Sequence, residues 1–272
     1  MKPYIALTKP GIIMGNALTA SAGFCFASRG PFDLHLFCAT LAGLCLIIAA
    51  ACVCNNCIDR EADQKMARTR NRPLATGRLS VRNALLFAAL LGIGGTALLI
   101  AYTNPLTVAL ALGGFAMYVF AYSFSKYKTH FATLIGSFAG AAPPVVGYCA
   151  ATHTFDLGAA LLFALVGFWQ MPHFYAIALY RLPDYASASI PIYPLVKGVP
   201  ATKRQMLFYT VAFACTAALL PLYIGPISLT LGLGWVALSL WGFKAQDDRK
   251  WARGMFLASL GIILATCLLL MV

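Results

Sequence analysis

Three oxygen-bearing side chains recur at helical intervals near residue 60. Asn55, Asp59 and Asp63 follow one another at steps of four residues. If a helix continues past Val53, this spacing keeps them on one face over about 12 Å of helix axis. Carboxylate and amide oxygens are hard ligands that suit Mg²⁺, which takes a few carboxylates together with substrate phosphates. The spacing therefore predicts that Asn55, Asp59 and Asp63 are catalytic residues that bind magnesium.

A basic segment follows these acids directly. Its cations include Lys65, Arg68 and Arg72, and arginine makes forked two-point contacts to phosphate groups. A solvated cytoplasmic loop of a membrane protein is also rich in basic residues, but that bias requires no carboxylates. The acids beside the cations therefore favour a site for a phosphate-bearing substrate, with Lys65, Arg68 and Arg72 as its contacts.

The composition is that of an integral membrane protein. Of the 272 residues, 61% are hydrophobic and only 10% are charged, and the mean hydropathy is +0.79, whereas soluble domains carry about 25% charged residues. The net charge of +12 would also suit a nucleic-acid-binding protein. The basic residues, however, occupy short loops between apolar segments, so membrane topology explains them better and no nucleic-acid partner is expected.

The nine cysteines do not indicate a redox or metal site. Most of them lie inside apolar segments, where cysteine behaves as a small hydrophobic residue. Cys54 and Cys57 form a C-x-x-C pair, but no second cysteine or histidine pair follows at zinc-site spacing.

Nine apolar segments are long enough to cross a bilayer core of about 30 Å. With the N-terminus in the cytoplasm, nineteen of the twenty Lys and Arg residues fall on the cytoplasmic side, and only Arg29 falls outside. We therefore predict an all-α, polytopic membrane bundle of nine transmembrane helices around a central cavity open to the cytoplasmic side. Pro143 and Pro144 should kink the fifth span and widen that cavity. The predicted spans are 11–28, 36–55, 84–102, 106–124, 131–151, 157–180, 206–224, 227–243 and 254–271.

An internal repeat relates two parts of what we expect to be a single domain, residues 1–272. A shift of 121 residues aligns Asp63 with Asp184, Arg60 with Arg181, and Asp59 with Tyr180. The repeated units run roughly over residues 36–130 and 157–253. Repeat-built membrane proteins often place equivalent segments on opposite sides of one cavity. We therefore predict that Asp184 faces Asp63 as a further catalytic and metal-binding acid, with Tyr180 and Arg181 beside the substrate.

Two smaller features concern the cytoplasmic side of the fourth to sixth spans. Lys126, Lys128 and His130 lie in a short basic turn, which either anchors the protein topologically or contacts phosphate. The run Trp169-Gln170-Met171-Pro172-His173 brings polar groups into the sixth span. Polar residues inside a span usually face a bundle interior or cavity, and His173 is either a packed histidine or a substrate contact.

Together these residues resemble a known family. The pattern Asn55-x-x-x-Asp59-x-x-x-Asp63 resembles the first acidic motif of the UbiA-type intramembrane prenyltransferases, and more narrowly of the branch that farnesylates protohaem IX. The second motif holds only Asp184, where quinone-pathway members carry a pair of acids, and this leaves open whether one or two Mg²⁺ ions bind. The resemblance rests on segments 56–63, 68–74, 140–148, 169–178, 184–191 and 247–253.

The resemblance implies a Mg²⁺-dependent transfer of the farnesyl group of farnesyl diphosphate to a vinyl group of haem b, in a bacterial cytoplasmic membrane. A haem that is a substrate requires no permanent axial ligand, and His130 and His173 are the two side chains that could orient its iron. The resemblance also implies haem A synthase or terminal oxidase assembly as partners beyond the lipid bilayer. The substrate contacts to be expected are Lys65, Arg68, Arg72, Lys126, Lys128, His130, His173, Tyr180 and Arg181.

Two other functions fit parts of the pattern. A prenyltransferase acting on an aromatic acid or quinone precursor would share the first motif, but the single acid of the second motif argues against it. A secondary transporter for an organic anion would explain repeated halves and a basic mouth. The paired acids beside an arginine cluster favour the enzyme, and release of diphosphate by purified membranes would separate the two.

Overall fold

The computed structural model describes every residue except Met1 and Arg29, and the described part of the chain forms helices joined by turns and loops, without strands. The predicted outer position of Arg29 therefore lies outside the described residues. In order, the helices are α1 (Lys2–Leu7), α2 (Pro10–Ala27), α3 (Leu34–Lys65), α4 (Val81–Tyr102), α5 (Pro105–Ala116), η1 (Met117–Tyr122), α6 (Ser123–Ser125), α7 (Ala132–Gly140), α8 (Ala142–Thr152), α9 (Leu157–Tyr180), α10 (Leu182–Ser187), α11 (Tyr193–Lys197), α12 (Val199–Ala218), α13 (Gly225–Trp241), η2 (Gly242–Lys244) and α14 (Asp248–Leu270).

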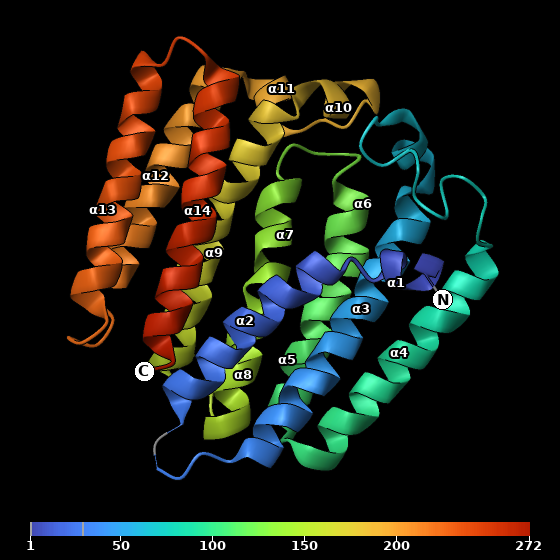
Figure 1. Ribbon diagram of the computed structural model, residues 1–272, viewed down its shortest axis with the longest axis vertical. Coiled ribbons are helices and arrows are strands. Elements are labelled where there is room, and N and C mark those ends of the chain that lie inside the picture. The colour runs from blue at the N-terminus through green and yellow to red at the C-terminus, as the bar shows by residue number, and fades with distance from the viewer. Residues whose placement is uncertain (1, 29) are drawn as a thin grey trace.

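Eight helical segments of the described chain are long and apolar enough to cross a membrane. They are α2, α3, α4, the α5–η1–α6 segment, the α7–α8 segment, α9, α13 and α14. The prediction of a polytopic helical bundle is thus confirmed. Figure 1 shows most of these helices running in roughly the same direction, with the short α10 and α11 lying across one end.

The predicted span that is missing from these eight is the seventh, residues 206–224. It corresponds to α12, which does not reach the apolarity of the other eight. We expected a helix over residues 206–224, but α12 covers Val199–Ala218, so its first turns include Lys203 and Arg204. Pro200 in the first turn of α12 favours this earlier start, and the backbone leaves the helix before Pro221. Because α12 packs against α9 and α13, it lies within the bundle, and the count of nine spans stays a prediction.

The second span is longer than predicted, and this extension positions the acids. We expected the span to end near Asn55, but α3 runs 32 residues, from Leu34 to Lys65. Asp33 caps its N-terminus by accepting a hydrogen bond from the Leu36 N–H at 2.9 Å. The condition on which the magnesium-site prediction rested, a helix continuing past Val53, is therefore met.

The fifth span is broken as the proline pair predicted. It consists of α7 and α8, which are separated at Ala141. Gly140, the last residue of α7, lies against the Gln170 side chain, and a methyl group added there would fall 2.0 Å from Gln170 Oε1. The break thus lets the α7–α8 segment approach α9 closely beside the cavity.

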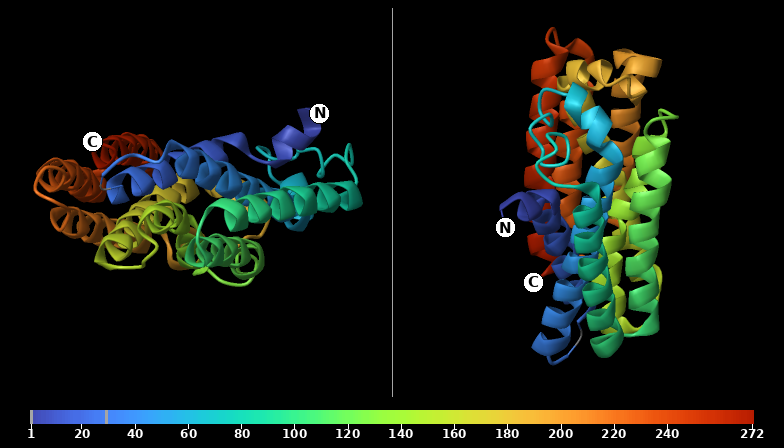
Figure 2. Two further views of the ribbon diagram at one scale, coloured as in Figure 1. Left: turned by 90° about the horizontal axis from the view of Figure 1, so that it is seen from below. Right: turned by 90° about the vertical axis from the view of Figure 1, so that its right-hand side faces the viewer.

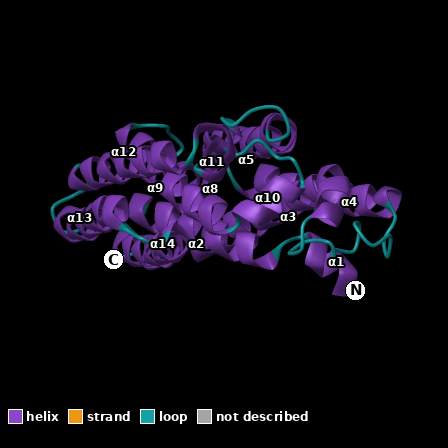
Figure 3. Ribbon diagram, turned by 90° about the horizontal axis from the view of Figure 1, so that it is seen from above, coloured by secondary structure: helices purple, strands orange, loops and turns teal. Residues whose placement is uncertain are grey.

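Helix α2 packs so closely on α8 that only glycine fits at the crossing. A Cβ atom on Gly23 would lie 2.0 Å from the Pro144 carbonyl oxygen, and one on Gly147 would lie 2.0 Å from the Ala20 carbonyl oxygen. This contact joins the N-terminal helices to the middle of the bundle, as the end-on views in Figures 2 and 3 show.

The segments outside the span helices dock onto one another at one end of the bundle. The Ser187 hydroxyl donates to the Lys65 carbonyl oxygen at 3.0 Å, which joins α10 to the end of α3. Buried Met66, Ala188 and Ile190 form a small apolar cluster between the two connections. The two segments that follow the predicted repeat helices α3 and α9 therefore meet at one end of the bundle (Figure 1). The duplication itself stays a prediction.

Candidate active site

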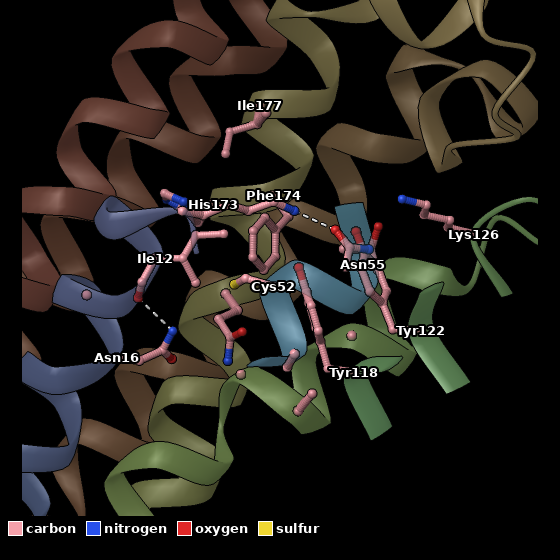
Figure 4. A pocket seen from close by; sticks show the side chains of 18 of the residues that line it. Ile12, Asn16, Cys52, Asn55, Tyr118, Tyr122, Lys126, His173, Phe174 and Ile177 are labelled. Atoms are coloured by element: carbon pink, nitrogen blue, oxygen red, sulfur yellow. Dashed lines mark hydrogen bonds between the residues drawn. The ribbon is translucent and has the colours of Figure 1, made fainter. Parts of the chain in front are cut away.

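A cavity of about 680 Å³ lies between the helices and changes character along its length. Along α3 its wall runs from Leu44 and Ile47 to Asp59 and Asp63. Asp59 lies 15 residues beyond Leu44, which corresponds to about 22 Å along a helix. The cavity is therefore long, with an apolar end inside the bundle and a charged end near α10. Figure 4 shows part of this wall, with Asn55, Tyr122 and Lys126 on one side and His173 on the other.

The three predicted α3 side chains face the cavity together. Asn55, Asp59 and Asp63 all line it, and their exposed fractions are 2%, 6% and 4%. The prediction that they share one helix face is confirmed. Two carboxylates with this little exposure require nearby cations or hydrogen-bond donors, because an isolated buried charge is costly.

Asp63 is paired with Arg72. One terminal nitrogen of the guanidinium donates to both carboxylate oxygens, at 2.8 and 3.0 Å. The loop that carries Arg72 is held in place by Gln64, whose amide donates to the Ala75 carbonyl oxygen at 2.9 Å. Because a single nitrogen makes the contact to Asp63, the remaining donors of Arg72 are available at the cavity wall.

Asp59 is held by two residues from the turn after α6. The Lys126 ammonium forms an ion pair with one carboxylate oxygen, and the Tyr127 hydroxyl donates to the other at 2.9 Å. Burial raises the pKa of Tyr127, and the neighbouring Asp59 carboxylate raises it further. Tyr127 therefore remains a neutral hydrogen-bond donor to Asp59 at physiological pH.

Asn55 connects α3 to the N-terminal segment and to the fourth span. Its amide oxygen accepts a hydrogen bond from the Lys9 ammonium, and its amide nitrogen donates to the Ser123 hydroxyl at 2.9 Å. Burial lowers the pKa of Lys9 to about 8. An incoming anion would favour the charged form of this lysine, so Lys9 adds a further cation to the charged end.

The fourth span contains a π-helical segment at the height of this site. Within η1, Tyr118 and Tyr122 stack with their ring centroids 5.4 Å apart, and both line the cavity. Such wide turns inside α-helices frequently mark functional sites. Here the wide turn places two aromatic rings between the charged end of the cavity and its apolar interior.

The opposite wall comes from α9. Trp169, Gln170 and His173 from the predicted polar run all line the cavity. The Trp169 and His173 rings stack at 4.8 Å, while the Gln170 amide nitrogen donates to backbone carbonyls of Ser137 and Val166. The interpretation of His173 as a packed histidine holds, because its ring is buried and stacked. The side chain also lines the cavity, and its contact with a substrate stays a prediction.

The structure brings together most, but not all, of the predicted site residues. Lining the cavity are Asn55, Asp59, Asp63, Arg68, Arg72, Lys126, His130 and His173. Five others are not among the residues that line it, namely Lys65, Lys128, Tyr180, Arg181 and Asp184. Asp184 lies in α10, which is docked on the end of α3. Its role as a metal ligand opposite Asp63 stays a prediction.

The donor set fits Mg²⁺ bound together with a substrate, rather than a preformed metal cage. Among the described residues no group of three or more His, Cys, Asp or Glu side chains could hold a metal ion by itself. Asp59, Asp63 and Asn55 nevertheless present oxygen atoms along one face, and Mg²⁺ is usually bound by one or two carboxylates plus substrate phosphates. The three α3 residues are therefore the ones that would hold the ion.

Several cavity residues were not predicted from the sequence. Lys9, Tyr118, Tyr122, Tyr127 and Tyr185 line the charged half. Lys9 and Tyr127 could have been suspected because each lies in a predicted cytoplasmic segment beside a span. The η1 tyrosines carried no such signal, since aromatic residues within an apolar segment are ordinary core residues.

The chain is similar to curated proteins over nearly its whole length. It is 49% identical over 266 residues to the protoheme IX farnesyltransferase of Protochlamydia amoebophila, with 96% of this chain and 94% of that protein covered. It is 46% identical over 267 residues to the protoheme IX farnesyltransferase of Cronobacter sakazakii, with 96% and 90% covered.

Solved structures share the fold at low sequence identity. A UbiA homologue from Archaeoglobus fulgidus, bound to GPP and Mg²⁺, superposes with a TM-score of 0.75 at 15% identity, covering 99% of this chain and 100% of that one. A digeranylgeranylglyceryl phosphate synthase gives a TM-score of 0.80 at 16% identity, covering 99% and 98%. Since residues 16–260 also match the model of the UbiA prenyltransferase family, the chain belongs to that family.

Proposed function

We propose that the protein transfers the farnesyl group of farnesyl diphosphate to a vinyl group of haem b, with addition of water. The observation that carries the proposal is the cavity that joins a cluster of acids and cations to an apolar interior. Relatives at 46–49% identity are named protoheme IX farnesyltransferases, which supports haem as the acceptor. No feature of the site favours an aromatic acid, a quinone precursor or a transported anion instead.

The charged end of the cavity suits the diphosphate. In the proposed complex Asn55, Asp59 and Asp63 hold Mg²⁺, which supplies charge neutralisation for the departing diphosphate. Arg72 and Lys126, which pair with the acids in this structure, then also contact phosphate oxygens. Fixed cations aimed at the charge that develops on the leaving group stabilise the transition state. Arg68, which also lines the cavity, adds a further positive charge.

The apolar part of the cavity suits the farnesyl chain and the cation that it forms. When the carbon–oxygen bond to diphosphate breaks, an allylic cation remains, and bulk water would quench it at once. Leu44, Ile47 and Phe115 line the interior, and the stacked Tyr118 and Tyr122 lie next to the acids. Aromatic faces attract cations, so these two rings are placed to stabilise the allylic carbon while excluding water.

The reaction balances with water as the only further reactant. A haem vinyl carbon forms the new carbon–carbon bond to the allylic carbon, and the positive charge passes to the vinyl carbon next to the porphyrin. A water molecule adds its oxygen there and releases one proton. The product carries a hydroxyethylfarnesyl group, and diphosphate leaves.

Transfer by the purified protein tests the proposal. The protein with haem b, farnesyl diphosphate and Mg²⁺ should yield a haem heavier by a farnesyl group plus a hydroxyl group. EDTA should stop the reaction, because an unneutralised diphosphate is a poor leaving group in a low-dielectric site. If haem is recovered unmodified while 4-hydroxybenzoate becomes prenylated, the acceptor is an aromatic acid and not haem. Absence of diphosphate release with either acceptor would overturn the enzyme assignment.

The proposal extends to the setting of the enzyme. The partition of nineteen of the twenty basic residues supports an N-terminus in the cytoplasm. The similarity to the protoheme IX farnesyltransferases supports a bacterial cytoplasmic membrane as the location. The diphosphate end of the cavity would then face the cytoplasm, where α10 and α11 lie. A haem A synthase or an assembling terminal oxidase is the expected recipient of the product.

A further inference from the structure

The run Trp169-Gln170-Met171-Pro172-His173 is bound to α14 through a single serine. Ser259 is fully buried. Its backbone carbonyl oxygen accepts a hydrogen bond from the Trp169 indole N–H at 2.8 Å. Its hydroxyl oxygen lies 2.7 Å from Nδ1 of His173. Ser259 thus fixes both of the stacked rings of α9, although it lies 86 residues after His173 in the chain.

The hydrogen bonds of Ser259 determine which nitrogen of His173 carries the proton. The serine hydroxyl has one proton, and its oxygen lies 2.5 Å from the Phe256 carbonyl oxygen, which can only accept. If the proton pointed elsewhere, two oxygen lone pairs would face each other at that distance. The hydroxyl therefore donates to Phe256 and accepts from His173, so Nδ1 of His173 is protonated.

The other nitrogen of His173 is consequently a lone-pair donor. Among the described residues, Nε2 of His173 has no hydrogen-bond partner, and the side chain lines the cavity. The ring is only 9% exposed and is flanked by Trp169 and Phe256, with ring centroids at 4.8 and 5.1 Å. An oriented imidazole with one nitrogen bound to the protein and the other free is the usual arrangement of a histidine that ligates a metal.

We infer that Nε2 of His173 ligates the iron of the acceptor haem, and that Ser259 is the positioning residue that presents this nitrogen. The inference rests on the proposed function, because that function supplies the haem. It places the porphyrin on the α9 and α14 wall, across the cavity from the acids of α3.

His130 is the competing ligand. It also lines the cavity, and its Nε2 is buried without a hydrogen-bond partner among the described residues. No described residue, however, fixes its tautomer, and its ring packs between Phe131 and Tyr193 at 4.2 and 5.6 Å. Because its tautomer is fixed by Ser259, His173 is favoured over His130 as the ligand of the haem iron.

Resonance Raman spectroscopy of the full-length protein with ferrous haem b tests the inference. We expect an iron–histidine stretching band in the wild type, its loss in His173→Gln, and its return when imidazole is added to His173→Gly. His153→Gln is the matched control, because His153 is exposed at the end of α8 and does not line the cavity. A band that persists in His173→Gln, or disappears in His130→Gln alone, would overturn the inference.

Ser259→Ala tests the positioning role separately. Without the acceptor for Nδ1–H the band should shift in frequency, and the Kd for haem should rise by about tenfold to a hundredfold, as for other partners of metal-bound histidines. An unchanged frequency would refute that role. If His173→Gln lowers kcat while the haem spectrum stays unchanged, the histidine acts on the attacking water and not on the iron.

The wild-type transfer assay keeps the two proposals apart. If farnesylated haem forms but the band does not depend on His173, only the iron ligation is wrong. If no haem product forms while the His173-dependent band is present, the proposed reaction is wrong and the haem site stands.

Discussion

The pair formed by Asp63 and Arg72 gives the sharpest test of the charged end of the cavity. Asp63→Asn keeps the shape of the side chain but removes its charge and one of the two oxygens that Arg72 contacts, at 2.8 and 3.0 Å. Asp63 is 4% exposed and lines the cavity. In the proposed complex the variant therefore loses a metal ligand and also leaves Arg72 without its counter-charge.

The expected loss of rate can be set against the expected loss of stability. Removing one group that stabilises the charge of a transition state costs about 2.7–4 kcal/mol, or about 10²–10³ in kcat. Separating a fully buried ion pair would destabilise the fold by about 3–5 kcal/mol. The side chain of Arg72, however, is 25% exposed, so solvent reduces that penalty to about 1 kcal/mol. The variant should therefore fold but turn over very slowly.

Product formation from haem b and farnesyl diphosphate, together with thermal unfolding in the same detergent, measures both effects. Glu61→Gln is the matched control, since Glu61 lies on the same helix only two residues away and its side chain is 79% exposed. Its ion pair with Arg60 at 3.4 Å should contribute little. Turnover of Asp63→Asn within a few-fold of Glu61→Gln would refute the role of the α3 acids.

Four further outcomes are expected. Asp184→Ala should lower turnover about as much as Asp63→Asn if Asp184 completes a two-sided metal site, and near-wild-type turnover would remove it from the site. Arg72→Lys should lower kcat in the same assay, because a compact ammonium cannot reproduce the forked two-point contact of a guanidinium; equal rates would contradict this. Gly147→Ala should destabilise the bundle by about 1–3 kcal/mol, because its methyl group would lie 2.0 Å from a backbone oxygen of α2. The control Gly261→Ala should leave stability unchanged, because a methyl group there meets nothing within 4 Å. Equal unfolding midpoints of the two variants would refute the close crossing of α2 and α8. A topology reporter fused after Gly225 should read external if α12 spans the membrane, and an internal reading would exclude nine spans.

The sequence by itself determined the features that depend on local periodicity. Helical spacing placed Asn55, Asp59 and Asp63 on one face, and apolar segments of span length located the helices, including α9 with both of its ends. The proline pair after Ala142 predicted the broken fifth span. These predictions hold because the period of an α-helix and the length needed to cross a bilayer are fixed by the backbone.

Where apolar character fades, the sequence located helix ends less well. The predicted spans 36–55 and 206–224 differ from the bounds of α3 and α12 by up to ten residues, because polar residues can continue a helix as readily as end it. The backbone hydrogen bonds of a helix do not depend on side-chain polarity, so hydropathy marks where a membrane ends rather than where a helix does.

Only the tertiary structure decided which side chains meet. Lys126 pairs with Asp59 from 67 residues away, Lys9 donates to Asn55 across 46 residues, and His173 contacts Ser259 across 86. None of these pairs has a spacing that a helix or turn would bring together. Such contacts depend on how distant helices pack, which follows from the fit of many side chains at once. The sequence therefore identified the acids that share the cavity face, while the packing of distant segments decided which cations surround them and which serine holds His173.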